Sequence, residues 1–101
     1  MEEWDIQYKE LLSMPEQSYR LIDIRDEASM SYGMIPGAEW LPTETIEQNL
    51  DAADKEKKLV LYCTRGALSV DTPSYIIIHR INIINPEYIM FRIILPITPH
   101  K

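Results

Sequence analysis

The only cysteine of this 101-residue chain, Cys63, directly follows the apolar run LVLY at 59–62. A short continuous run of strand-forming residues predicts a strand that is buried on both faces, as in a parallel sheet. The residues after the cysteine are mostly small or polar and include Gly66, which predicts a tight turn that opens a helix near Ala67. The sulfur would then lie at the carboxyl end of a parallel strand, where open α/β sheets bind their ligands.

The chemistry that this arrangement favours is nucleophilic attack by a thiolate. Backbone N–H groups of residues 64–68 can surround the sulfur as an anion-binding nest, and such a field lowers the pKa of a thiol. Arg65 is a candidate for recruiting an anionic substrate, and the Thr64 hydroxyl is a candidate hydrogen-bonding group in the loop. The plainer alternatives are a buried structural cysteine and two side chains that point to solvent. The strand, the neighbouring arginine and the glycine turn favour the reactive interpretation.

A second buried strand is predicted at 19–25, and it carries two charged residues that must be explained. Asp23 and Arg25 are two apart on this strand, so they point to the same face. We expect them to form a structural ion pair and not to act in catalysis.

The remaining elements before Cys63 are predicted from helix caps and turn residues. They are, in chain order, a helix at 4–14 capped by Asp5, a helix from Asp26 to Tyr32 ended by Gly33, a turn at 35–38, a brief strand at 40–41, a helix from Thr43 to about Leu50, and a solvated charged connection at 51–58. Strands that alternate with short helices predict an α/β fold, with a parallel sheet flanked by helices on both faces.

The composition changes after Asp71. Residues 1–71 hold fifteen acidic and seven basic side chains, whereas residues 72–101 hold one and three, and ten of the fifteen isoleucines lie between Ile76 and Ile97. In this part we expect a helix at 67–80 that is disturbed by Pro73, a short strand at 82–84, and a helix or strand at 87–95.

The overall composition indicates one globular domain. Hydrophobic residues make up 46% and charged residues 26%, and the net charge of −6 argues against nucleic acid and anionic membranes as partners. A single cysteine excludes an internal disulfide and favours a cytoplasmic protein; the acidic N-terminus has no secretory signal, and no apolar span is long enough to cross a membrane. His79 and His100 are 21 apart with no second cysteine, so no metal site and no cofactor are expected.

Three segments together resemble the single-domain rhodanese-like sulfurtransferases, over roughly residues 4–72. They are LIDIRDE at 21–27, GMIPGA at 33–38 and LYCTRG at 61–66. The resemblance implies a central parallel sheet of about four to five strands between helices. It also implies a sulfane sulfur carried as a persulfide on Cys63, with Asp23 and Arg25 in the framework beneath the loop. The implied substrate-binding loop consists of Thr64, Arg65, Gly66, Ala67 and Leu68.

The chain departs from the family pattern at several positions. Met34 stands where the family usually has histidine, and Leu68 stands where many members have an arginine that closes the loop. The C-terminal Gly-Gly turn and the tryptophan after it are absent. We therefore expect one rhodanese-like domain over 1–101 whose segment 72–101 is atypical, of the kind that a shifted reading frame in an AT-rich gene would produce.

The function that the resemblance implies is sulfur transfer from thiosulfate or a persulfide. A small anionic donor would give its outer sulfur to Cys63, and an external thiol or cyanide-type acceptor would remove it. One alternative is a catalytically inactive binding or regulatory module with the same fold, which an altered C-terminal third would favour. Another is a Cys-dependent phosphatase or arsenate reductase, but such sites require the loop-closing arginine that Leu68 replaces.

Overall fold

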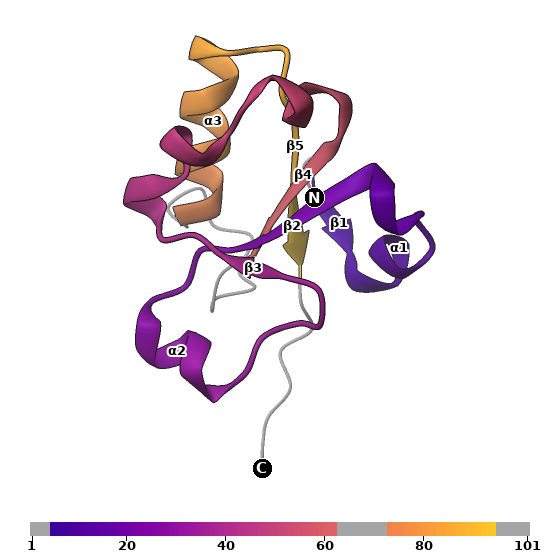
Figure 1. Cartoon of the computed structure of the whole chain (residues 1–101), viewed down its shortest axis with the longest axis vertical. Helices are drawn as coiled ribbons and strands as arrows, with labels where there is room; N and C mark the ends of the chain where they lie inside the picture. Colours follow the sequence, from indigo (N-terminus) through magenta and orange to yellow (C-terminus); the bar gives the residue numbers. More distant parts are fainter. Residues whose placement is uncertain (1–4, 63–72, 95–101) are drawn as a thin grey trace.

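The structure, a computed structural model, describes residues 5–62 and 73–94 and contains one parallel sheet in the order β1-β5-β4-β2-β3 (Figure 1). The strands are β1 (Asp5–Gln7), β2 (Tyr19–Asp23), β3 (Glu39–Trp40), β4 (Lys58–Tyr62) and β5 (Ile89–Ile94). Every strand pair is parallel, which confirms the predicted α/β sheet. Strand β4 lies at the centre, and this position explains its unbroken apolar sequence.

The helices cover both faces of the sheet. They are α1 (Tyr8–Leu12), α2 (Glu27–Tyr32) and α3 (Pro73–Ile84), and four short 3-10 turns complete the described elements: η1 (Glu16–Ser18), η2 (Thr43–Thr45), η3 (Glu47–Asn49) and η4 (Ala52–Glu56). Figure 1 shows α1 and α3 on opposite sides of the strands. Within the described part of the chain, no helix has the length and apolar character needed to cross a membrane.

The described residues form two apolar core clusters, one on each face of the sheet. Leu59 and Leu61 of β4 pack with Ile78 of α3, whereas Val60 of the same strand packs with Leu11 of α1. Successive side chains of a strand point to opposite faces, so one apolar strand supplies both clusters.

The N-terminal segment differs from the prediction, because β1 (Asp5–Gln7) stands near the start of the expected helix 4–14 and the helix itself is confined to Tyr8–Leu12. Asp5 is not a helix cap. Its carboxylate accepts hydrogen bonds from Nε and Nη2 of Arg92 on β5 at 2.8 and 3.0 Å, and both side chains are buried. Asp5 therefore stabilises the pairing of β1 with β5, the first and last strands of the described chain.

The segment between β3 and β4 also differs from the prediction. The expected helix from Thr43 to Leu50 is two 3-10 turns, η2 and η3, and Thr43 provides no side-chain cap. The connection at 51–58 is not fully solvated, because it contains η4 and the buried side chain of Asp54. The many charged residues of this segment indicated solvent exposure, but one of them, Asp54, makes a buried tertiary contact.

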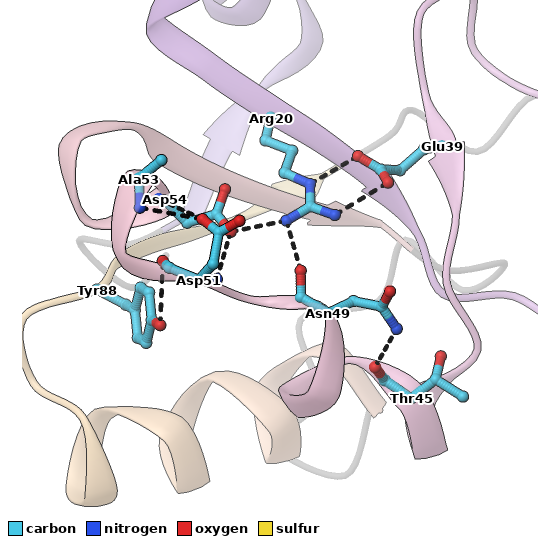
Figure 2. Close-up of polar contacts among 8 residues, drawn as sticks. All are labelled: Arg20, Glu39, Thr45, Asn49, Asp51, Ala53, Asp54 and Tyr88. Atoms are coloured by element: carbon cyan, nitrogen blue, oxygen red, sulfur yellow. Dashed lines mark hydrogen bonds and ion pairs between the residues drawn. The ribbon is translucent and has the colours of Figure 1, made fainter.

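That contact is made by Arg20 of β2, which joins three segments (Figure 2). Its Nε and Nη2 donate to the carboxylate of Glu39 at 2.6 and 3.0 Å. Its Nη1 donates to Oδ2 of Asp54 at 2.8 Å and to the carbonyl oxygen of Asn49 at 2.9 Å. One guanidinium therefore fixes β3 and the η3–η4 connection against β2.

Replacement of Arg20 by leucine is expected to lower the free energy of unfolding by about 2 kcal/mol, because the Asp54 carboxylate then lacks this partner in a buried position. The matched control is Arg80→Leu, which removes an exposed ion pair with Glu47 and is expected to cost less than about 1 kcal/mol. Urea denaturation measures both changes. Equal midpoints for the two variants would show that the Arg20 contacts contribute little.

The described C-terminal part is regular. Pro73 is the first residue of α3, a position where proline is compatible with a helix, so it does not disturb the element. The helix continues through Ile84, so the predicted strand at 82–84 is wrong: burial of Ile77, Ile78 and Ile81 against the sheet outweighs the local strand preference.

The last predicted element is strand β5, which lies between β1 and β4. The sheet therefore keeps a regular strand from the atypical segment, and the expected irregularity is not found over residues 73–94. A shifted reading frame as the origin of segment 72–101 stays a prediction. Residues 67–72, where the expected helix begins, lie outside the described residues.

Candidate functional site

A cluster of buried polar groups lies where β2 and β4 end. Asp23 and Tyr62, the last residues of these strands, are aligned partners in the sheet. The hydroxyl of Tyr62 donates a hydrogen bond of 2.9 Å to Oδ2 of Asp23, and the two residues are 2% and 0% exposed. A side-chain hydrogen bond therefore joins the two strand ends in addition to the backbone ladder.

The Asp23 carboxylate also binds Arg25, as the sequence predicted for this pair. Nε and Nη2 of Arg25 donate to it at 2.9 and 2.8 Å, and the backbone N–H of Arg25 donates to Oδ1 at 2.9 Å. The hydrogen bonds from Arg25 to this carboxylate raise the pKa of the guanidinium, so it stays charged. Its carbon Cζ lies 5.4 Å from the centre of the Tyr62 ring, within the range of cation–π attraction.

The turn that follows α2 is attached to the same cluster. Nη2 of Arg25 donates to the carbonyl oxygen of Gly33, and the backbone N–H of Ile35 donates to the Tyr62 hydroxyl at 3.1 Å. Gly37 has a φ of +88°, a backbone conformation that strongly favours glycine. This conformation explains why a glycine follows Pro36 in the turn. Trp40 of β3 donates from Nε1 to the Arg25 carbonyl oxygen at 2.8 Å, which extends the connections to the edge strand.

Burial raises the pKa of Tyr62 above its ordinary value, and the hydrogen bond to Asp23 acts in the same direction. The hydroxyl therefore keeps its proton at neutral pH. A protonated hydroxyl can donate to the carboxylate and accept from the Ile35 N–H at the same time, which is the arrangement observed.

Of the predicted site residues, the structure describes two, Asp23 and Arg25, and it brings them together. Cys63 follows Tyr62 in the sequence and lies outside the described residues, as do Thr64, Arg65, Gly66, Ala67 and Leu68. Their roles in binding and chemistry stay predictions.

Sequence reasoning assigned no role to Tyr62. The available signal was a tyrosine within an otherwise apolar buried strand, because a buried phenol usually has a hydrogen-bond partner. The second signal was an aspartate at the end of a neighbouring buried strand, since a buried carboxylate requires donors.

Comparison with known protein families gives a match to the rhodanese-like domain over residues 7–83. A sulfurtransferase of Allochromatium vinosum is 38% identical over 56 residues, 55% of this chain and 52% of that protein. The putative sulfurtransferase YtwF of Bacillus subtilis is 32% identical over 68 residues, 67% and 65% of the two chains. The thiosulfate sulfurtransferase GlpE of Shewanella oneidensis is 34% identical, with 66% and 67% covered. The match thus spans about half the length of the first relative and just under two thirds of the second.

Solved structures share the fold. The human single-domain sulfurtransferase superimposes with a TM-score of 0.69 at 18% identity, over 92% of this chain and 90% of that one. A rhodanese-like domain protein of Staphylococcus aureus gives 0.65 at 22% identity, over 86% and 80%. At these identities the similarity establishes the architecture of the sheet and helices.

Proposed function

Since this chain belongs to the rhodanese-like domain family, we propose that it is a sulfurtransferase that carries a sulfane sulfur on Cys63. The observation that carries the proposal is the cluster of buried Asp23 and Tyr62 with partly buried Arg25, which lies at the carboxyl ends of β2 and β4, directly before the only cysteine. The names of the relatives support it, because all three are called sulfurtransferases and one is called a thiosulfate sulfurtransferase.

The reaction proceeds in two displacements at sulfur. The Cys63 thiolate attacks the outer sulfur of thiosulfate, the S–S bond of the donor breaks, and sulfite leaves with the electron pair, so that a persulfide forms. A thiolate or cyanide then attacks the outer sulfur of that persulfide, and the cysteine leaves as a thiolate. The acceptor becomes a persulfide or thiocyanate, and because the chain has no second cysteine, the acceptor comes from outside.

The described residues support this chemistry in two ways: they compensate a buried negative charge and they hold two strand ends together. Arg25 compensates the buried charge of Asp23, so this carboxylate opposes a thiolate or an approaching anionic donor less than a bare carboxylate would. Because the carboxylate, the guanidinium and the phenol bind one another, the ends of β2 and β4 are held together at the edge of the sheet that precedes Cys63.

The test of this proposal is the formation of thiocyanate from thiosulfate and cyanide, measured beside phosphate release from an aryl phosphate and reduction of arsenate. We expect saturable thiocyanate formation and no activity with the other two substrates. Phosphate release or arsenate reduction without thiocyanate formation would overturn the proposal in favour of the phosphatase or reductase alternative. Folded protein without any activity would leave a binding or regulatory module as the function.

Replacement of Arg65 by alanine is expected to raise KM for thiosulfate roughly tenfold, because a charge-assisted hydrogen bond to the donor is lost. The melting temperature is expected to change little, as for most surface substitutions. Arg80→Ala is the matched control, since Arg80 is exposed on α3 and pairs with Glu47. Steady-state kinetics with thiosulfate check the expectation, and an unchanged kcat/KM in Arg65→Ala would mean that this side chain does not bind the donor.

A further inference from the structure

We propose that Tyr62 is a positioning residue for Cys63: its hydroxyl joins the buried Asp23 carboxylate to the backbone of Ile35 and thereby fixes the end of β4 that leads into the cysteine. The inference deepens the proposed function and rests on it for the identity of the reactive group. Its structural basis lies entirely in described residues.

The Tyr62 hydroxyl makes two hydrogen bonds of opposite sense. It donates to Oδ2 of Asp23 at 2.9 Å and accepts from the Ile35 N–H at 3.1 Å. A phenylalanine fills the same space but makes neither bond. The hydroxyl is therefore the specific link between the end of β2, the end of β4 and the turn at 33–38.

The backbone of Tyr62 is held as firmly as its side chain. Its carbonyl oxygen accepts a hydrogen bond from the Ile24 N–H at 3.1 Å. Its ring packs in the apolar cluster that contains Leu11 of α1, and Arg25 lies over one face of the ring. A peptide group is planar, so a fixed carbonyl at residue 62 restrains the start of residue 63. Loss of the hydroxyl removes the hydrogen bonds to Asp23 and Ile35, so the side chain of Tyr62 no longer adds to this restraint.

The same hydroxyl affects charge at this edge of the sheet. Among the described residues, the charged groups near it are Asp23 at the end of β2 and Arg25 just after that strand, and the turn contributes the Ile35 N–H. The O–H dipole offsets part of the carboxylate's negative field. Without the hydroxyl of Tyr62, the negative field of the carboxylate is stronger and a thiolate at Cys63 is less favoured. The pKa of the Cys63 thiol is therefore expected to rise.

The test compares Tyr62→Phe with wild type and with the matched control Tyr88→Phe. The hydroxyl of Tyr88 donates to the Asp51 carbonyl oxygen at 3.3 Å, so the control also loses one hydroxyl hydrogen bond. This bond lies near the amino ends of the strands, far from Tyr62 along β4. Tyr88 precedes the first residue of β5, and that residue is aligned with Lys58, the first residue of β4.

Two readouts are measured well below the melting temperature of each protein. The first is the rate of Cys63 alkylation by iodoacetamide between about pH 5 and pH 10, the range in which thiols titrate. The second is the separate determination of kcat and KM with thiosulfate. Tyr62→Phe is expected to shift the alkylation midpoint to higher pH and to lower kcat roughly tenfold while KM changes less than about twofold. Tyr88→Phe is expected to match wild type.

Two outcomes overturn the inference, and a third overturns only the proposed function. If Tyr62→Phe has a lower melting temperature but the wild-type alkylation profile and kcat, the hydroxyl is only structural. If Tyr62→Phe fails to fold while Tyr88→Phe folds, the hydroxyl is required by the sheet itself and does not act through Cys63. If wild type takes no sulfur from thiosulfate, the proposed function fails, but the alkylation comparison still decides the role of Tyr62.

Discussion

A Cys63→Ser variant is expected to form no thiocyanate above background, a loss of at least about 1,000-fold. A serine hydroxyl is not ionised at neutral pH and cannot hold a sulfane sulfur as a persulfide, and no second cysteine can replace it. The measurement is the rate of thiocyanate formation at saturating thiosulfate and cyanide. Circular dichroism and the melting temperature establish that the variant is folded.

A Cys63→Ala variant is the control for the new hydroxyl and is expected to be equally inactive. Turnover retained in either folded variant would show that the cysteine is not the sulfur carrier. In that case, the Asp23–Arg25–Tyr62 cluster would be a structural feature of the sheet and not the support of a reactive loop.

An Asp5→Ala variant is expected to lose about 3–5 kcal/mol of unfolding free energy. The Asp5–Arg92 pair is bidentate, and the two side chains are 0% and 4% exposed. Removal of the carboxylate leaves a buried guanidinium without this counter-charge, next to the strand pair that holds β1 on the sheet. Such a loss is a large part of the 5–15 kcal/mol that typically stabilises a small domain.

The double variant Asp5→Leu with Arg92→Met tests whether the loss of stability in Asp5→Ala comes from the buried charge of Arg92. Both charges are then replaced by apolar side chains, which often restores stability at buried ion pairs, so the double variant is expected to be more stable than Asp5→Ala. Glu47→Ala serves as the surface control, because its ion pair with Arg80 is exposed. Urea denaturation ranks the three proteins, and an Asp5→Ala shift no larger than that of Glu47→Ala would contradict the expectation.

Local signals predicted the parts of the fold that local contacts determine. Asp26 accepts a hydrogen bond from the Ser29 N–H and caps α2, and Gly33 ends it, as expected from residue types alone. Asp5 also has a helix-capping pattern, but its partner is 87 residues away on β5, and no local rule distinguishes a cap from a buried ion pair. The same limit applies to Asp54, whose charged neighbours indicated solvent but whose carboxylate binds a distant arginine.

At the candidate site, too, local contacts were predictable from the sequence and long-range contacts were not. The Asp23–Arg25 pair was predicted from strand alternation over 19–25; β2 ends at Asp23, but Arg25, two residues later, still reaches the carboxylate. The Tyr62 hydroxyl was not, because its partners come from segments 39 and 27 residues away in the sequence. Buried polar atoms in apolar strands are therefore the signal to follow in sequences of this kind, since each one requires a partner from another element.

The most direct test of sulfur transfer through Cys63 is the intact mass of the purified protein before and after incubation with thiosulfate. The proposed function predicts a gain equal to one sulfur atom, loss of that gain after addition of cyanide, and no change at either step in Cys63→Ser. An unchanged mass of folded wild-type protein after thiosulfate would contradict it.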